Sequence, residues 1–312
     1  MRVFLCGGEL GLGFAVGQRL LAEGHKVTML TSYEDLIPNL TKNRMNPVLG
    51  NVQDASVQQN VAKADAVIDV ELPNTLLIQK VHVARLRPYL LAQTLQGSGR
   101  PLIVTSSAAV LGDTGSNPVD ESAPLRPLQG YAWLPRLEKE ILKSSRVRSI
   151  VIRPAWELHG CRPPNWSIAI GNWMRLAKRF RHGKYIGSGE NCYSAVHFDD
   201  LADLYCVALK KAGAGTILHA ASENFSMKEL AATIHRGLAF KGEPSSLSLK
   251  DARRFSPIAD ALTQSHALSG DLARTLGWRP YRESIMKEIE QRSFENAFAS
   301  RLKLPSTECK NA

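Results

Sequence analysis

The feature of this sequence that most constrains its fold is a glycine-rich turn between two short apolar segments near the N-terminus. Residues 3–6 and 26–30 are each apolar over the length of a buried strand. Between them stand the glycine cluster of residues 7–13 and an apolar repeat of helical spacing over residues 12–21, which Gly24 closes. A strand, a glycine turn, a helix and a second strand in this order predict the first unit of a dinucleotide-binding fold, in which amides at a helix N-terminus face a pyrophosphate.

The glycine turn matches neither common dinucleotide pattern completely. A Gly-x-x-Gly-x-x-Gly pattern fits at Gly7 and Gly13 but has Leu10 in its middle position, and a Gly-x-Gly-x-x-Gly pattern has Cys6 in its first position. Such a degenerate turn is a weak signal by itself, and an ordinary strand-to-helix turn is the alternative. On the dinucleotide interpretation, the residues expected to contact the cofactor here are Gly7, Gly8, Glu9, Leu10, Gly11, Leu12 and Gly13.

The composition is that of a globular protein in a reducing compartment. Apolar residues make up 44% and charged residues 22% of the 312 positions, which predicts one large domain or two closely joined ones. No apolar run approaches the ~18 residues of a membrane span, and the N-terminus already reads as a strand instead of a secretory signal. The five cysteines are widely spaced without a Cys-x-x-Cys pair, which favours no metal site, no disulfide framework and a cytoplasmic location.

The net charge of +10 leaves the kind of anionic partner open. The densest basic cluster lies within residues 175–184, and it is interpreted first as the solvated face of an amphipathic helix. A rim for an anionic substrate or for cofactor phosphates is the second interpretation, and nucleic acid is the third because no nucleic-acid-binding motif accompanies the charge. The expected partner is therefore a small-molecule substrate, with no nucleic acid and no membrane; a homodimer is left open.

Further short apolar segments alternate with helical patterns up to about residue 155. The strand candidates after the first two are residues 47–50, 66–70, 102–105 and 149–153. Strands of this kind, separated by helices, predict an α/β fold with a doubly wound parallel sheet covered by helices on both faces. Further along, Ser226 and Glu229 stand at the spacing of a capping box and predict the start of a helix.

Four later segments resemble one known family. Residues 105–112 read TSSAAVLG, residues 120–125 read DESAPL ahead of Tyr131, residues 187–203 contain GSGEN and VHFDDLAD, and residues 276–280 read LGWRP. Together with Arg153-Pro154 they resemble the short-chain dehydrogenase/reductases, and most closely their extended and atypical branch, the NAD-dependent epimerase/dehydratase family. The resemblance covers about residues 2–290.

The resemblance implies a Rossmann fold with a smaller C-terminal substrate-binding domain. We expect the dinucleotide-binding domain at residues 1–155, with residues 190–212 packing back on it. Residues 156–300 would mainly form the substrate-binding domain, and residues 301–312 a flexible tail.

The resemblance also implies catalytic roles. In this family a tyrosine phenol exchanges a proton with the substrate, a serine hydroxyl holds the substrate oxygen, and a lysine four residues after the tyrosine lowers the tyrosine pKa. Ser107 and Tyr131 match the first two, but Pro135 stands at the lysine position. Since proline is tolerated at the first position of a helix, we expect the helix to begin at about Leu134 or Pro135, after Tyr131. Arg136 is the expected substitute for the lysine, and a surface arginine is the alternative.

Several expected cofactor contacts lie at strand ends, and some depart from the family pattern. Asn51 replaces the usual aspartate, Glu71 replaces a small residue, and Glu9 lies within the glycine turn. The full set beyond the glycine turn is Thr31, Ser32, Asn51, Val52, Glu71, Thr105, Tyr131, Arg153 and Pro154. An acid that would hold the adenosine ribose is missing at the end of the second strand until Glu34, so NADP is favoured and NAD is the alternative.

Two functions are carried forward from the sequence. The first is an NAD(P)-dependent oxidoreductase or epimerase-like enzyme acting on a small hydroxyl- or carbonyl-bearing metabolite. The second is a non-redox member of the same family, either a cyclase or isomerase or a nucleotide-binding protein without catalysis, because the Tyr-x-x-x-Lys motif is incomplete. A nucleic-acid or interaction protein on the same fold is the third and least favoured alternative.

Overall fold

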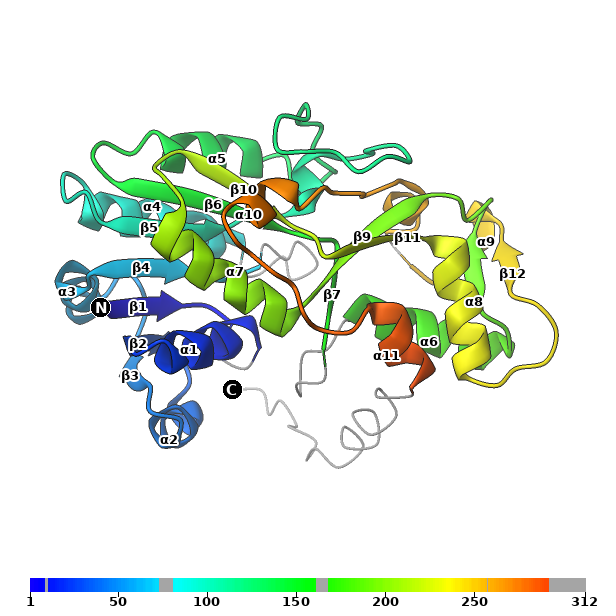
Figure 1. The fold of residues 1–312 in the computed structure, drawn as a ribbon, viewed down its shortest axis with the longest axis horizontal. Coiled ribbons are helices and arrows are strands. Elements are labelled where there is room, and N and C mark those ends of the chain that lie inside the picture. The colour runs from blue at the N-terminus through cyan, green and yellow to red at the C-terminus, as the bar shows by residue number, and fades with distance from the viewer. Residues whose placement is uncertain (9–10, 73–80, 161–167, 257, 292–312) are drawn as a thin grey trace, which may run out of the picture.

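A seven-stranded parallel sheet organises the N-terminal part of the chain. The computed structural model describes residues 1–8, 11–72, 81–160, 168–256 and 258–291. The strand order is β10-β6-β5-β4-β1-β2-β3, and all pairings are parallel. The strands are β1 (Arg2–Cys6), β2 (Lys26–Thr31), β3 (Asn46–Leu49), β4 (Ala66–Asp69), β5 (Pro101–Thr105), β6 (Arg148–Pro154) and β10 (Thr216–Ala220). This is the predicted doubly wound, Rossmann-like arrangement, and the prediction is confirmed (Figure 1).

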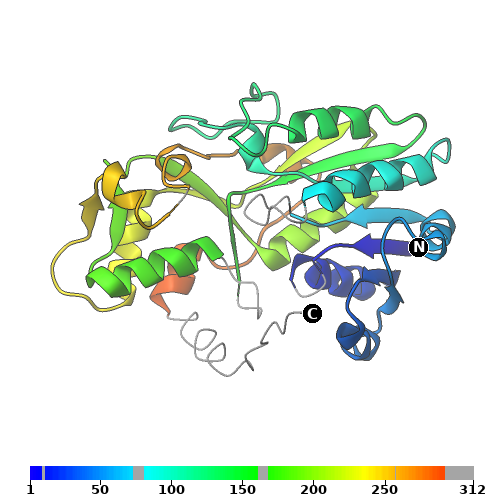
Figure 2. The same cartoon turned by 180° about the vertical axis from the view of Figure 1, so that it is seen from behind.

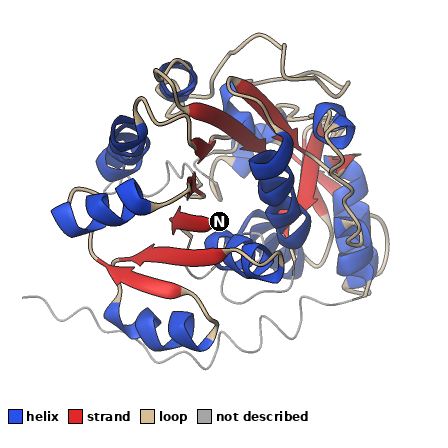
Figure 3. Cartoon of the chain, turned by 60° about the vertical axis from the view of Figure 1, so that its left-hand side comes forward, coloured by secondary structure: helices blue, strands red, loops and turns tan. Residues whose placement is uncertain are grey.

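Helices cover both faces of this sheet. Helices α1 and α7 lie side by side on one face, and α3, α4 and α5 lie along the other (Figures 1 and 2). Their bounds are α1 (Leu12–Ala22), α3 (Ala55–Lys63), α4 (Val81–Leu95), α5 (Leu134–Leu142) and α7 (Phe198–Lys211), with the shorter α2 (Ile37–Lys42) and α10 (Asp271–Thr275) at the periphery. Short 3-10 turns occur at Glu34–Leu36, Ala108–Val110 and Ala261–Thr263. Figure 3 shows the strands as a twisted layer between the helices.

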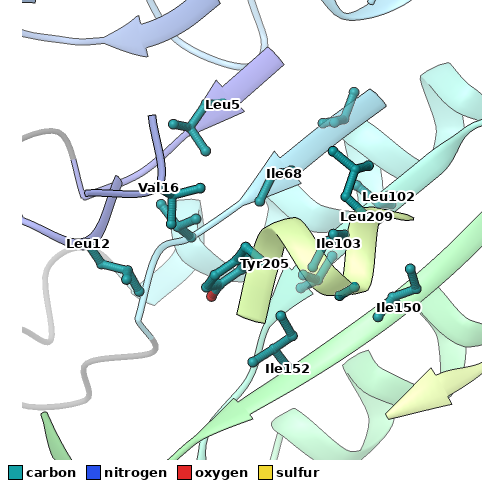
Figure 4. Packing of buried hydrophobic residues seen from close by; sticks show 14 of the residues in the cluster. Leu5, Leu12, Val16, Ile68, Leu102, Ile103, Ile150, Ile152, Tyr205 and Leu209 are labelled. Carbon is teal, nitrogen blue, oxygen red and sulfur yellow. The ribbon is translucent and has the colours of Figure 1, made fainter. Parts of the chain in front are cut away.

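The core of this part lies between the sheet and its helices. Strands β4 and β5 are buried at every position, as expected for strands with helices on both faces. Figure 4 shows Leu5 and Ile68 from adjacent strands close to Tyr205 of α7, and all three side chains are fully buried. Strand β1 lies in the interior of the sheet between β2 and β4, so the predicted place of the first strand is confirmed.

A second hydrophobic cluster organises the C-terminal part. A three-stranded sheet of order β11-β9-β7 and a pair of strands, β12 and β8, lie beside helices α6, α8, α9 and α11. The strands are β7 (Glu157–His159), β8 (Lys184–Ile186), β9 (Cys192–His197), β11 (Glu223–Ser226) and β12 (Ser245–Leu247), and the helices are α6 (Ile168–Phe180), α8 (Met227–Gly237), α9 (Leu249–Ala252) and α11 (Ile285–Glu290). Ser226 and Glu229 form the predicted capping box of α8. In the described part of the chain, none of the helices has both the length and the apolar content that a membrane crossing requires.

Candidate active site

The glycine turn forms a close-fitting cradle at the carboxyl end of β1. Gly7 and Gly8 have φ angles of 85° and 61°, in the left-handed region that favours glycine. A Cβ atom at Gly13 would lie 2.1 Å from the Gly7 carbonyl oxygen, so α1 begins directly against the turn. No acidic side chain stands in the first turn of α1. A backbone groove at an unopposed helix N-terminus fits a pyrophosphate. Of the residues expected here, Glu9 and Leu10 lie outside the described residues.

Three charged side chains gather where β4 ends. The Arg87 guanidinium of α4 donates to both carboxylate oxygens of Asp69, with Nε at 3.1 and 3.0 Å. The Arg87 Nη2 atom also lies 3.8 Å from Oε2 of Glu71, whose side chain is 42% exposed. The Glu71 backbone closes one side of the glycine turn, because a Cβ atom at Gly7 would lie 2.7 Å from the Glu71 nitrogen.

The neighbouring strand end is fixed by a buried hydroxyl pair. The Thr105 hydroxyl donates to the Asp69 carbonyl oxygen at 2.7 Å, and Thr105 Oγ1 and Tyr205 Oη are 2.5 Å apart. Burial is the main cause that raises the pKa of Tyr205, so its phenol is neutral. Thr105 therefore ties β4, β5 and α7 together, and the structure places it beneath the candidate groove.

At the other end of the candidate groove, the expected adenosine contacts differ in accessibility. Thr31 is fully buried, and its hydroxyl accepts from the Tyr33 backbone at 3.2 Å. Ser32 is exposed and donates to the Gly50 carbonyl oxygen at 3.3 Å. The Asn51 nitrogen donates to Asp54 at 2.6 Å, and the Val52 side chain is buried. The residue that presents a free edge at the end of β2 is therefore Ser32 rather than Thr31.

Ser107 and Tyr131 are brought together by the segment that joins β5 to α5. Ser107 follows β5, is half-buried, and accepts from the Ala109 backbone at 3.2 Å. The segment before Tyr131 is bonded to the segment after Ser107, because Leu128 N donates to the Ala109 carbonyl oxygen at 2.9 Å. Tyr131 is half-buried against the main core, and its carbonyl oxygen accepts from Leu134 N at 2.9 Å. The helix begins at Leu134, as predicted from Pro135.

The orientation of α5 places Arg136 away from the sheet. The buried residues of this helix are Leu134, Leu137, Glu138 and Ile141. The Arg136 side chain is 82% exposed, and its Nε donates to Oε1 of Glu140 at 2.7 Å. Together with Tyr89 it lines a surface hollow on the outer faces of α4 and α5. This placement argues against the expectation that Arg136 substitutes for the lysine, because a helix cannot present one residue to both faces.

Arg153, expected near the cofactor, is held in the interior instead. Its guanidinium donates to Glu138 through Nε at 3.0 Å and Nη2 at 2.6 Å, and Arg153 and Glu138 are both almost fully buried. Its Nη1 atom lies 3.4 Å from Nε2 of His219. Burial, followed by the charge of Arg153, lowers the pKa of His219 to about 4. The contacts of Arg153 thus join α5, β6 and β10 beneath the site, and Pro154 ends β6 beside them.

The chain was compared with known proteins. The model of the NAD dependent epimerase/dehydratase family matches residues 3–221. The protein is a member of the NAD-dependent epimerase/dehydratase family. An uncharacterized protein of Schizosaccharomyces pombe is 29% identical over 300 residues, covering 93% of this chain and 98% of its own. An uncharacterized protein of Saccharomyces cerevisiae is 23% identical over 304 residues, covering 93% and 98%.

Solved structures of this family share the fold. The UDP-glucose 4-epimerase of Thermotoga maritima, solved with UDP-glucose, has a TM-score of 0.74 at 17% identity, covering 97% of this chain and 100% of its own. The UDP-glucuronic acid 4-epimerase of Bacillus cereus, solved with UDP-glucuronic acid and NAD, has a TM-score of 0.72 at 15% identity, covering 96% and 100%. These likenesses confirm the predicted fold and the family.

Within this epimerase/dehydratase fold, sequence reasoning missed the partners that hold the site together. Asp69 and Arg87 form an almost buried pair, and Glu138 neutralises Arg153. The available signals were a charged residue ending an apolar strand, at Asp69, and an acid within the apolar repeat of α5, at Glu138. Neither signal names its partner, which comes from another element.

Proposed function

We propose that the protein is an NAD(P)-dependent oxidoreductase or epimerase-like enzyme that acts on a small hydroxyl- or carbonyl-bearing metabolite. The observation that carries the proposal is the cradle formed by Gly7, Gly8 and Gly13, in which side chains are excluded and a helix N-terminus is exposed to a ligand. The carboxyl ends of β1, β4 and β5 meet at this cradle, which is where ligands bind in doubly wound sheets. Isothermal titration with NAD and NADP tests it, followed by nicotinamide absorbance with a panel of carbonyl compounds.

Ser107 and Tyr131 are the proposed proton-handling groups. A bound nicotinamide would accept or return a hydride, while the chain itself must hold the substrate oxygen and move its proton. A serine hydroxyl can donate a hydrogen bond to that oxygen, and a phenol with an ordinary pKa of ~10 is suited to give a proton rather than take one at neutral pH. Without an adjacent cation on α5, the favoured direction is therefore reduction of a carbonyl, with Tyr131 as the acid.

NADP remains the proposed cofactor, with NAD as the alternative. The end of β2 continues through Thr31, Ser32 and Tyr33, and the first acid, Glu34, lies in the following 3-10 turn. The Ser32 hydroxyl is exposed and can donate to a 2′-phosphate. A carboxylate placed there would instead repel that phosphate. The ratio of the two dissociation constants in the titration decides between them.

A non-redox member of the family is the second candidate, and the orientation of α5 favours it. On the sheet-facing side of this helix stand Leu134, Leu137 and Ile141, with Glu138 already paired to Arg153. None of these can act as a cation that would lower the pKa of Tyr131. Dinucleotide binding without any nicotinamide turnover would support this second function.

Replacing Tyr131 with phenylalanine distinguishes the two functions. If the protein transfers hydride, turnover should fall by about 10²- to 10⁴-fold, because a positioned acid is lost. Dinucleotide affinity should stay within about 3-fold, since only one hydroxyl facing the substrate is removed. Steady-state rates and titration of the same preparation measure both. Tyr281→Phe is the control, because that ring is 61% exposed on the surface; unchanged turnover in Tyr131→Phe would exclude the proposed role of the phenol.

A further inference from the structure

Glu71 places a carboxylate beside the glycine turn in an environment that fixes its position. The Arg87 guanidinium is committed to Asp69, whose carboxylate it contacts at 3.0 and 3.1 Å, and it reaches Glu71 Oε2 at a longer 3.8 Å. The Glu71 backbone nitrogen donates to Oδ1 of Asp69 at 3.2 Å. Asp69 and Arg87 cancel each other in charge, so the group as a whole presents one negative charge, on Glu71.

The topology determines which part of a dinucleotide would pass Glu71. In a doubly wound sheet the pyrophosphate lies at the N-terminus of the first helix, and the adenosine half extends over the end of the second strand. In this sheet β2 lies on one side of β1 and β4 on the other. The nicotinamide half must therefore extend over the ends of β4 and β5. Glu71 follows β4 directly and lies against Gly7, with its side chain 42% exposed.

We infer that the carboxylate of Glu71 is a specificity-determining group that shifts binding toward the oxidised dinucleotide. The oxidised nicotinamide carries a positive charge that the reduced ring lacks, and the two forms are otherwise nearly identical in charge and shape. A fixed negative charge on the side of the nicotinamide stabilises only the oxidised form. At a separation of about 6 Å, one unit charge changes the binding constant of another by about 3-fold in a water-like dielectric and about 10-fold at half that dielectric.

The pyrophosphate does not obscure this effect. Glu71 also repels the two phosphates, and removing its charge should tighten both redox forms by the same factor. The ratio of the two dissociation constants cancels this common factor, together with any change in the backbone around Gly7. The inference rests on the proposed function only in requiring that a nicotinamide dinucleotide binds.

The test compares dissociation constants of NAD⁺, NADH, NADP⁺ and NADPH by titration, without any turnover. Glu71→Gln keeps the shape of the side chain and removes its charge. We expect it to reduce the preference for the oxidised form by about 3- to 10-fold, and Glu71→Asp to keep most of that preference. The preference of the unaltered protein should also shrink between about 50 and 500 mM salt, because a half-exposed charge is screened.

Glu190→Gln is the matched control, since it removes one carboxylate that is 70% exposed and paired with Lys228 at 3.6 Å in the C-terminal part. An equal change in the ratio for both glutamine variants, or no change in Glu71→Gln, would overturn the inference while dinucleotide binding and the proposed function stand. Absence of binding by all four dinucleotides to the unaltered protein would overturn both. Circular dichroism of each variant confirms that the fold is intact.

Discussion

Gly13→Ala is expected to weaken dinucleotide binding by at least about 100-fold and to lower the free energy of unfolding by about 1–3 kcal/mol, the usual cost of an overpacked methyl group. The added Cβ would lie 2.1 Å from the Gly7 carbonyl oxygen and 2.9 Å from both C and O of Gly8. All three are backbone atoms, so no side-chain rotation relieves the clash. Either the turn opens or α1 moves away, and in both cases the amides no longer face a pyrophosphate.

Gly213→Ala is the control for this variant. The nearest atom that its Cβ would meet is Thr216 Oγ1 at 4.0 Å, an ordinary contact distance. Thermal unfolding and titration with the preferred dinucleotide measure the two effects separately. If Gly13→Ala bound the dinucleotide with unaltered affinity, the cradle could not be the binding site and the proposed function would lose its main support.

The features predicted correctly from sequence are those that local chemistry determines. Apolar runs the length of a strand, separated by helical repeats, are enough to specify a parallel sheet with helices on both faces. Pro135 predicted where α5 begins because proline removes only a hydrogen bond that the first turn does not make. The capping box at Ser226 and Glu229 is equally local.

The face on which Arg136 lies could have been predicted, but the spacing from Tyr131 was followed instead. Leu134, Leu137 and Ile141 repeat at three and four residues, so they define the buried side of α5, and Arg136 falls outside it. Counting from a motif tyrosine assumes that the tyrosine is on the helix. Here Tyr131 precedes the helix, and the count no longer has a geometric meaning.

The polar groups beneath the site could not be predicted, because each depends on a partner from a distant element. Asp69 is neutralised by Arg87, 18 positions later, and Thr105 meets Tyr205, 100 positions later. A single sequence shows the charge or hydroxyl but not which surface covers it. Thr105 was therefore expected to contact a cofactor, whereas its hydroxyl is already engaged by Asp69 and Tyr205.

Arg153→Met is expected to cost about 3–5 kcal/mol of unfolding free energy, the range for removing one partner of a buried ion pair. The side chains of Arg153 and Glu138 are 2% and 4% exposed, and their closest N–O distance is 2.6 Å. The variant would leave a carboxylate in the interior without a cation or compensating donor. Arg2→Met is the matched control, because Arg2 and Asp65 are at a similar distance, 2.8 Å, but their side chains are 62% and 39% exposed; its loss should be much smaller.

The double variant Glu138→Leu/Arg153→Met separates the charge from the packing. If the uncompensated carboxylate causes the loss, removing it as well should restore most of the stability, since well-packed apolar side chains often replace a buried pair at little net cost. Denaturant unfolding of the two single variants and the double variant gives the coupling free energy, which should be large for groups in direct contact. Additive losses would show instead that each side chain contributes through packing alone. Restored stability with retained dinucleotide binding would establish that Arg153 supports the site through α5 and does not touch the cofactor.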